Sequence, residues 1–351
     1  MQNVIECRSV WKVFGVRAAE ALRAARHDNA SKAEIMERFH CVVGVADVSF
    51  SVGEGEIFCI MGLSGSGKST LIRHVNRLID STSGEILIEG QDINALRGAA
   101  LRRMRSEKMA MVFQNVALLP HRTVLDNVAL GLELRGVPAS KRHAVAREKL
   151  DLVALGSWAH RYPDDLSGGM KQRVGLARAM ASDPDILLMD EPFSALDPLI
   201  RRELQDQFLA LARVMRKTTL FITHDLDEAI RIGSRIAIMK DGRVVQVGTP
   251  EEIVTKPADD YVAGFVAGMS RLDLVTAGSI MRPLSELPAD YAGRLGDLRS
   301  VPPAATINAV VSASCETADP VLVSEDGEAV GVITNRTLLL GIQGQPARQA
   351  A

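Results

Sequence analysis

A glycine-rich stretch with one lysine and several hydroxyl side chains carries the most explicit chemistry in this chain. In Gly62–Thr70 (GLSGSGKST), a glycine is followed after four residues by Gly-Lys-Ser, which is the phosphate-loop pattern. The glycines let backbone N–H groups turn inward and form an anion-binding nest. The lysine can reach the β- and γ-phosphates of a nucleotide, and the serine hydroxyl can ligate Mg²⁺. The residues predicted to bind nucleotide here are Gly62, Leu63, Ser64, Gly65, Ser66, Gly67, Lys68, Ser69 and Thr70.

The segments on either side of this loop support the prediction. Glu56–Met61 (EIFCIM) is a short apolar run, typical of a buried parallel strand. A helix is predicted from Ser69 onward, with its N-terminus toward the phosphates. The alternative is a glycine-rich turn that matches the pattern by accident, at roughly one chance in a hundred from average residue frequencies. The flanking strand and helix weaken that alternative further.

Two consecutive carboxylates end a second apolar run, Asp185–Asp190 (DILLMD). Asp190 is placed to hold Mg²⁺ through its water shell, as in other phosphoryl-transfer sites. Glu191, one residue on, is the candidate base that orients the attacking water. The alternative is a strand-ending turn that caps the next helix. The continuation MDEPFSALD makes that alternative the weaker interpretation.

A histidine and a glutamine follow two further apolar runs. His224 comes directly after Thr218–Thr223 (TTLFIT), and Gln114 comes after Met109–Phe113 (MAMVF). Because ligands bind at the carboxyl ends of parallel strands, His224 is predicted to contact the γ-phosphate and Gln114 to sense Mg²⁺ or water. Either residue taken alone is more often structural. The predicted catalytic residues are Lys68, Glu191 and His224, and the predicted metal ligands are Ser69, Gln114 and Asp190.

A second glycine motif lies about a hundred residues after the phosphate loop. Leu166–Val174 (LSGGMKQRV) places Ser-Gly-Gly at the start of a predicted helix, Met170–Ala181, and so forms a second anion-binding helix N-terminus. An enzyme with one phosphate loop has no use for such a motif within its own chain. The motif makes sense if it closes over the nucleotide held by another copy of the same fold.

With these motifs in this order, the chain resembles the ATP-binding subunits of ABC transporters from about Val4 to Gly268. The resemblance implies an α/β fold, the P-loop NTPase cassette with a mixed sheet core, an antiparallel β subdomain and an α-helical subdomain. It implies ATP and Mg²⁺ as ligands. It also implies a homodimer that ATP holds together and hydrolysis releases. The residues that the resemblance assigns to the signature motif and to the contact across the dimer are Ser167, Gly168, Gly169, Gln172 and Asp197.

The resemblance also implies an aromatic side chain stacked on adenine. In this family that aromatic lies near the N-terminus, two residues after a basic one. Lys12-Val13-Phe14 puts Phe14 at this position. Trp11 is the competing candidate, and a core role remains open for both.

A closer resemblance lies between Phe14 and Gly62, where the chain inserts extra residues from Val16 to about Val43. Ser31 and Glu34 form a capping-box pattern at the start of a predicted helix, Lys32–Phe39. This insert, with the later stretch MVFQNVALLPHRTVLDNVALGLEL, resembles the glycine betaine/proline and choline importers of the family. The basic side chains of the insert are predicted to lie on a solvated pair of helices rather than against a membrane.

That resemblance implies an ATP-hydrolysing subunit of a membrane importer for choline or glycine betaine/proline betaine. The implied partners are transmembrane permease subunits and, indirectly, a periplasmic or extracytoplasmic solute-binding protein. The implied location is the cytoplasmic face of the inner membrane. One alternative is an importer of another small polar solute, such as an amino acid. Others are a soluble ABC ATPase outside transport, or a nucleotide sensor. The single phosphate loop and signature argue against the soluble ATPase, and the intact hydrolytic residues argue against the sensor.

The length of the chain and its pattern beyond the motifs predict two domains. The 351 residues are more than one typical domain needs. The predicted division is 1–268, with a helical subdomain at about 123–180, and 269–351. A hairpin is predicted at Arg235–Val247, with Asp-Gly as its turn. In the second domain, Asp319–Ile342 is predicted as strand, Asp-Gly turn, strand and helix, which resembles half of a CBS-type module, a small α+β tail.

Composition sets the remaining limits. A hydrophobic content of 47% supplies ample core. The formal net charge of −2 gives no case for a nucleic-acid partner. No apolar run reaches the length of a membrane span. The four cysteines, Cys7, Cys41, Cys59 and Cys315, show no metal-ligand spacing and are expected to be reduced.

Overall fold

The computed structural model describes residues 3–28, 30–114, 116–194, 196–267, 269–291, 293–317 and 319–343, apart from the side chains of 213–215 and 316. Two compact units make up the chain, Met1–Val247 and Gly248–Ala351. This division falls before the boundary expected at Gly268, which lies outside the described residues. The expectation that 269–351 forms a domain of its own stays a prediction.

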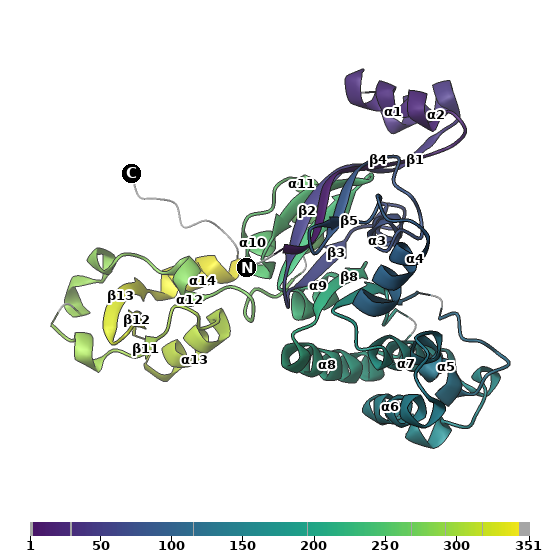
Figure 1. The fold of residues 1–351 in the computed structure, drawn as a ribbon. Coiled ribbons are helices and arrows are strands. Elements are labelled where there is room, and N and C mark those ends of the chain that lie inside the picture. The colour runs from purple at the N-terminus through teal and green to yellow at the C-terminus, as the bar shows by residue number, and fades with distance from the viewer. Residues whose placement is uncertain are drawn as a thin grey trace. The chain divides into compact units, whose positions relative to one another are not determined.

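The first unit is built on a six-stranded sheet of order β10-β9-β3-β8-β7-β6. Its two central strands, β3 and β8, are labelled in Figure 1. The adjacent pairs β6–β7, β7–β8, β8–β3 and β3–β9 are all parallel. Every residue of β3, β7 and β8 is buried, as expected for a parallel sheet covered on both faces. The strands are β3 (Ile57–Met61), β6 (Met109–Val112), β7 (Ile186–Asp190), β8 (Thr218–Thr223), β9 (Arg235–Lys240) and β10 (Arg243–Gly248).

The four apolar runs predicted as strands of this sheet are confirmed, each to within one residue at either end. The hairpin prediction is also confirmed. Asp241 and Gly242 separate β9 from β10, and both have positive φ angles, 49° and 77°, as a two-residue hairpin turn requires.

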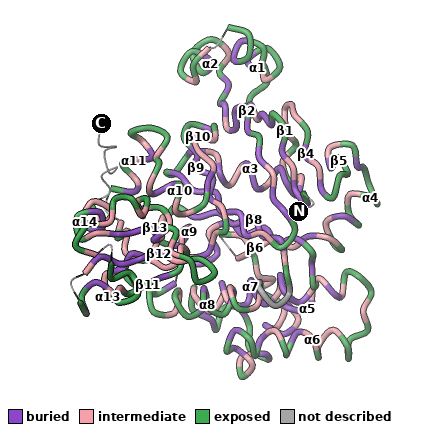
Figure 2. Tube along the Cα trace, turned by 90° about the vertical axis from the view of Figure 1, so that its left-hand side faces the viewer, coloured by how far each residue is buried: buried purple, intermediate pink, exposed green. Residues whose placement is uncertain are grey.

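A second, antiparallel sheet of order β2-β1-β4-β5 packs against the first. Its strands are β1 (Asn3–Phe14), β2 (Val42–Gly53), β4 (Ser83–Ile88) and β5 (Gln91–Asp92). The rings of Phe50 on β2 and Phe58 on β3 stack with their centroids 5.1 Å apart. Figure 2 shows buried residues following the strands of both sheets. One hydrophobic core therefore joins the two sheets.

The predicted insert forms two helices, α1 (Ala18–His27) and α2 (Lys32–Phe39), between β1 and β2 (Figure 1). The capping box is present as predicted. The Glu34 backbone N–H donates to Ser31 Oγ at 3.2 Å, and the Ser31 backbone N–H donates to Glu34 Oε2 at 2.7 Å. A small separate core holds the insert on the strands, with Ile35 of α2 and Trp11 of β1 both buried in it.

The remaining helices of the first unit frame the sheet and form a helical region. At the ends of sheet strands lie α3 (Lys68–Val75), α8 (Pro198–Met215) and α9 (Leu226–Ile232). Before β6 come α4 (Gly98–Arg103) and the π-helical turn η1 (Met104–Lys108). Where a helical subdomain is predicted, α5 packs on both α6 and α7. This region contains α5 (Val124–Leu134), α6 (Ala139–Leu152), η2 (Gly156–Trp158), η3 (Pro163–Asp165) and α7 (Gly168–Ala181).

The second unit has a three-stranded sheet of order β11-β12-β13 with its own core around Val310 and Val323. The predicted strand, Asp-Gly turn, strand and helix are all present in β12, β13 and α14. The likeness to a CBS module stays a prediction. The strands are β11 (Ser300–Val301), β12 (Val321–Glu325) and β13 (Glu328–Ile333). The helices are α10 (Pro250–Thr255), α11 (Asp260–Val266), α12 (Ala277–Ile280), η4 (Leu284–Glu286), η5 (Ala289–Tyr291), η6 (Leu295–Asp297), α13 (Ile307–Thr317) and α14 (Asn335–Gln343).

Within the described ranges, none of the helices combines the length and the apolar character that crossing a bilayer takes. All four cysteines are free thiols. Cys7, Cys41 and Cys59 are buried, and Cys315 is exposed. Burial raises the pKa of the Cys59 thiol well above its usual value.

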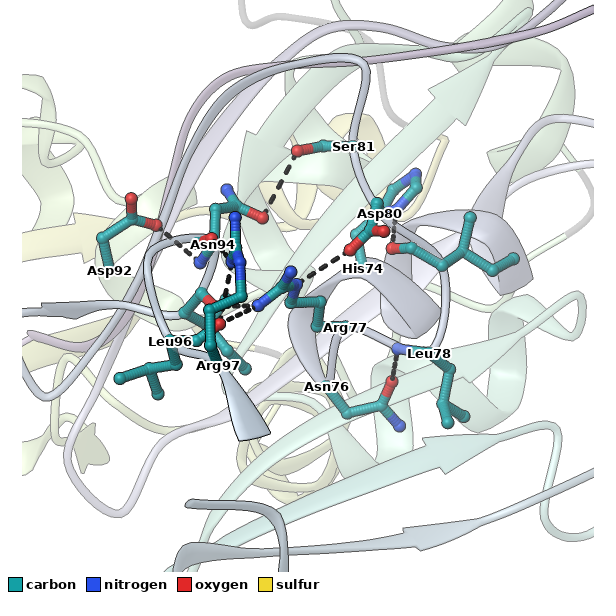
Figure 3. Close-up of polar contacts among 12 residues, drawn as sticks. His74, Asn76, Arg77, Leu78, Asp80, Ser81, Asp92, Asn94, Leu96 and Arg97 are labelled. Carbon is teal, nitrogen blue, oxygen red and sulfur yellow. Dashed lines mark hydrogen bonds and ion pairs between the residues drawn. The ribbon is translucent and has the colours of Figure 1, made fainter. Parts of the chain in front are cut away.

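Arg77 helps to fix the segment that follows α3 (Figure 3). Arg77 has a left-handed backbone (φ 54°). Its Nε donates to Asp80 Oδ1 at 2.8 Å, and its Nη1 donates to the carbonyl oxygens of Ile93, at 3.2 Å, and Leu96. These bonds tie the C-terminal end of α3 to the chain that follows β5. They therefore help to hold α3 in place with its first turn at the phosphate loop.

Replacing Arg77 with alanine should destabilise the first unit, because it removes the hydrogen bonds to Asp80, Ile93 and Leu96 that join α3 to the chain after β5. A typical hydrogen bond contributes about 0.5–1.5 kcal/mol net. Thermal unfolding of Arg77→Ala is therefore expected to begin at a lower temperature than in the wild type. Arg102→Ala, on the exposed surface of α4, is the matched control and should change stability by less than about 0.5 kcal/mol. Equal melting temperatures for both variants would contradict this role of Arg77.

Candidate functional site

The glycine-rich loop lies between the end of β3 and the start of α3, and its glycines are required by close backbone contacts. Gly62 and Gly67 have φ angles of 152° and 100°. A Cβ on Gly67 would lie 2.3 Å from the Gly44 carbonyl oxygen, and one on Gly62 would lie 2.2 Å from the Met239 carbonyl oxygen. The backbone of the loop thus packs directly against β2 and β9, with no room for any side chain.

Lys68, the first residue of α3, is only 5% exposed. Its Nζ donates to the carbonyl oxygens of Gly62, at 2.8 Å, and Leu63, at 3.0 Å. Burial lowers the pKa of Lys68, while the nearby Glu191 and Asp190 carboxylates oppose that shift. The ammonium group is therefore held over the loop, where its charge can meet phosphate oxygens.

Asp190 ends β7 and is completely buried. Its Oδ1 accepts a hydrogen bond from Ser69 Oγ at 2.8 Å. Within the part of the chain that the structure describes, its Oδ2 has no hydrogen-bond partner, and it lies 3.6 Å from Arg73 Nη2. Burial raises the pKa of the Asp190 carboxyl group, against the opposing effect of the Ser69 hydrogen bond. A hydroxyl oxygen beside a carboxylate oxygen that lacks a partner suits Mg²⁺, which prefers oxygen ligands and keeps several waters.

Three predicted residues from three parallel strands meet at one carboxylate. Gln114 Nε2 donates to Glu191 Oε2 at 3.1 Å, and His224 Nδ1 lies 3.1 Å from the same oxygen. Glu191 has a left-handed backbone (φ 48°), and its N–H donates to the Ile222 carbonyl oxygen of β8. Such a conformation costs about 1–3 kcal/mol and is common at active sites. The arrangement fixes Glu191 at the carboxyl edge of the sheet.

A cavity of about 460 Å³ joins these groups. Its polar lining includes Lys68, Ser69, Gln114 and Glu191, and its apolar lining includes Phe14. The volume is in the range of small-ligand sites. The cavity therefore connects the loop with Gln114 and Glu191 and with the end of β1.

Phe14 and Trp11 are the two candidates for the aromatic side chain that stacks on adenine, and they differ in their exposure to the cavity. Phe14 lines the cavity and is 38% exposed. Trp11 is 3% exposed, and the guanidinium groups of Arg26 and Arg243 lie over its ring. In this structure only the Phe14 ring is accessible from the cavity.

The signature residues do not line this cavity of the described chain. Ser167 caps α7 by accepting from the Met170 N–H at 3.3 Å, and Asp197 caps α8 by accepting from the Leu199 N–H at 3.1 Å. Ser167 and Gly168 are exposed. Gln172 is 4% exposed, and neither atom of its amide has a hydrogen-bond partner within the described residues. Within one chain, these predicted nucleotide ligands are thus separate from the loop.

Two features of the site were not predicted from the sequence. Lys32 and Met36 of α2 belong to the lining of the cavity. The β9–β10 turn holds the glycine-rich loop from outside. The Gly242 N–H donates to the Ser66 carbonyl oxygen at 2.9 Å, and the Gly242 carbonyl oxygen accepts from the Ala46 N–H at 2.8 Å. From the sequence this turn was predicted only as a hairpin turn, and its long-range contacts were not predicted.

This fold and site define a P-loop nucleotide-binding domain of the ABC cassette class. Comparison with known proteins agrees. A family profile described as "ABC transporter" matches residues 45–194. Two solved cassettes, described as a dimeric bacterial ABC transporter cassette and as its post-hydrolysis dimer bound to ADP and Pi, are 32% and 31% identical, with TM-scores of 0.60 and 0.61. Each match covers 70% of this chain and 98% of the cassette.

Curated relatives are more similar still. The glycine betaine/proline betaine transport system ATP-binding protein of Escherichia coli K12 is 53% identical over 79% of this chain and 69% of its own length. The trimethylamine N-oxide transport system ATP-binding protein of Ruegeria pomeroyi is 44% identical over 96% of both chains. The chain therefore belongs to the family of ABC transporter ATP-binding proteins. The resemblance inferred from its motifs is confirmed.

The contact between Gly242 and the loop predicts an effect on nucleotide binding from a residue outside the cavity. A Cβ on Gly242 would lie 2.9 Å from the Gly44 carbonyl oxygen, so Gly242→Ala must displace either β2 or the turn that holds Ser66. The expected result is a rise of about tenfold in the Kd for ATP, equivalent to about 1.4 kcal/mol. Equilibrium titration with ATP measures it.

The second unit offers a matched control in its own Asp-Gly turn. Gly327 has φ 87°, and nothing lies within 4 Å of an added Cβ. Gly327→Ala carries a similar backbone strain without a steric contact, and should bind ATP like the wild type. If Gly242→Ala also binds ATP like the wild type, the turn does not support the loop.

Proposed function

We propose that this chain is the ATP-hydrolysing subunit of a membrane importer for a small osmolyte that carries a methylated nitrogen, such as glycine betaine, proline betaine or choline. The observation that carries the proposal is the meeting of Gln114, Glu191 and His224 at one edge of the cavity that Lys68 and Ser69 also line. The transport names of the relatives supply the solute class.

In this proposal the nucleotide lies along the cavity, with its terminal phosphate toward Glu191 and its base toward Phe14. The N–H groups of the glycine-rich loop and the Lys68 ammonium group bind the phosphates. Ser69 and Asp190, with Gln114 nearby, would hold Mg²⁺, which when bound neutralises charge on the phosphate oxygens. Phe14 offers a ring face on which adenine stacks.

Phosphoryl transfer depends mainly on positioning and electrostatic stabilisation, and the site residues divide these tasks. Glu191 accepts a proton from, and orients, the attacking water. His224 contacts the γ-phosphate, and Gln114 helps to place the water or the metal ion. Because Glu191 is fixed by its backbone bond to β8 and by two side chains, its carboxylate loses little freedom when water binds.

The signature residues complete the site of a second subunit. Ser167, Gly168 and Gly169 start a 14-residue helix whose N-terminus suits a phosphate group, yet they do not line the cavity of their own chain. Gln172 lies on the same helix, and Asp197 would connect the two sites. A homodimer closed by ATP brings each signature to the partner's γ-phosphate. Dimeric solved cassettes support this arrangement.

The partners in transport follow from the same proposal. Membrane-spanning permease subunits carry the solute, and a periplasmic or extracytoplasmic binding protein delivers it. The chain then acts at the cytoplasmic face of the inner membrane, as a peripheral subunit. Nucleic acid has no part in this function, in keeping with the net charge of −2.

Glu191→Gln should lower ATP turnover by about 10²-fold or more, the usual contribution of a general base. ATP binding should persist, so that the variant accumulates as an ATP-bound dimer. Phosphate release and light scattering after size-exclusion chromatography measure the two effects. Glu54→Gln, an exposed substitution in the β2–β3 turn, is the control and should hydrolyse ATP normally. Wild-type turnover in Glu191→Gln would rule out the assigned base.

The solute class is tested by uptake. Cells that lack this gene should fail to accumulate labelled glycine betaine, choline or trimethylamine N-oxide, and the intact gene should restore uptake of at least one of them. Lys68→Ala should not restore uptake, because the phosphates of ATP lose the ammonium group that binds them. Restoration confined to a labelled amino acid would favour the alternative importer. No change in uptake of any solute would favour a role outside transport.

A further inference from the structure

The helical insert contributes side chains to the nucleotide cavity, and neither their residue types nor the family motifs predict this. Lys32 and Met36 are both part of the cavity lining. They are four residues apart on α2, so they share one face of the helix. The helix itself is anchored next to this face, because Ile35, three residues after Lys32, is fully buried in the small core of the insert with Trp11, Cys41 and Val43. The face with Lys32 and Met36 therefore has a defined position.

Lys32 lies beside the phosphate loop. Its Nζ is 3.4 Å from the position that a Cβ on Gly242 would occupy, and Gly242 is hydrogen-bonded to Ser66 of the loop. The capping box at Ser31 fixes the backbone immediately before Lys32. The end of this long side chain is thus close to the loop, although the residue itself is on the insert.

The ammonium group of Lys32 has no protein partner among the described residues, since neither an ion pair nor a hydrogen bond reaches it. The charged groups around it are Asp241, which favours its charge, and Arg243, which opposes it. The residue is half-buried, and burial lowers the pKa of its ammonium group. A half-buried ammonium group that forms neither a hydrogen bond nor a close ion pair within the described residues, next to a phosphate-binding loop, is suited to an anionic ligand.

The order of residues along the cavity indicates which part of the ligand is near the insert. Gln114 and Glu191 follow β6 and β7, at the hydrolytic end. Gly44 lies at the other end, where an added Cβ would be 2.8 Å from Phe14 Cε2 and 3.7 Å from Thr70 Cγ2. Cys41, Val42 and Val43 line the same end as Phe14. These residues continue directly from α2 along the chain.

The geometry points to a direct role of the insert in nucleotide binding: Lys32 binds the α-phosphate and ribose portion, and Met36 covers the base beside Phe14. This inference rests on the proposed function, since it takes the ligand to be ATP. A long flexible thioether suits the edge of a planar ring, and Met36 is 45% exposed and available for that contact. The insert is then one wall of the site rather than a solvated attachment.

The contact should affect ATP and ADP equally, because both carry the α-phosphate. In the full chain, Lys32→Gln should raise the Kd of each nucleotide about tenfold or more, as expected for one hydrogen bond to a charged group. The loss should appear in the KM for ATP rather than in kcat, because the contact is equally strong before and during phosphoryl transfer. Lys32→Arg, which keeps the cation, should recover most of the affinity.

A matched control comes from the other helix of the insert. Arg23→Gln removes one positive charge from an exposed position on α1 and should leave both Kd values within twofold of the wild type. Met36→Ala is the second variant and should weaken both nucleotides about two- to fivefold. Melting temperatures of the nucleotide-free variants should equal that of the wild type, because neither side chain has a partner in the folded core.

The controls separate failure of this inference from failure of the proposed function. If Lys32→Gln and Met36→Ala bind ATP and ADP like the wild type while Lys68→Ala does not, the insert is not part of the site and the proposed function stands. Equal losses in Lys32→Gln and Arg23→Gln would show a general charge effect, and would also overturn the contact. If Lys68→Ala keeps full affinity, the nucleotide site itself is wrong.

Discussion

The site depends on the packing of three glycines from three distant parts of the chain. Gly67 of the phosphate loop and Gly242 of the β9–β10 turn both approach the carbonyl oxygen of Gly44 on β2 so closely that no Cβ fits at either position. Backbone hydrogen bonds from Gly242 to Ser66 and from Ala46 to Gly242 close the arrangement. The loop therefore has fixed N–H directions before a nucleotide arrives, and little conformational entropy is lost on binding.

Two charged side chains, of a kind that is rarely buried in a folded protein, are buried beside this rigid loop. Lys68 and Asp190 are almost completely buried, and burial shifts the pKa of each toward its neutral form. Their mutual attraction and the Ser69 hydrogen bond offset only part of that cost. In the proposed function, a phosphate and Mg²⁺ bound beside these two groups would offset the rest of that cost.

The sequence predicted the parts of this structure that local patterns encode. Buried strands, the capping box at Ser31 and the Asp241-Gly242 turn are visible as apolar runs and short motifs, and each was found where expected. The association of Gln114, Glu191 and His224 was predictable because residues that follow parallel strands meet at the carboxyl edge of the sheet. Contacts between distant segments were not predictable in this way. Nothing in the pattern of α2 shows that Lys32 lies beside Gly242, because that contact depends on how β1 and β2 carry the insert.

Substitutions at the two ends of the cavity should affect different properties: the chemical step at one end and nucleotide affinity at the other. In the proposed function, residues at the hydrolytic end, such as Glu191, contact the reacting groups, so substitutions there alter the chemical step. The opposite end would contact parts of the nucleotide that do not react, so binding energy gained there would be equal in the ground state and the transition state. A segment inserted between β1 and β2 can thus adjust nucleotide affinity without disturbing hydrolysis. The small separate core under α1 and α2 allows such a segment to vary while the phosphate loop keeps its geometry.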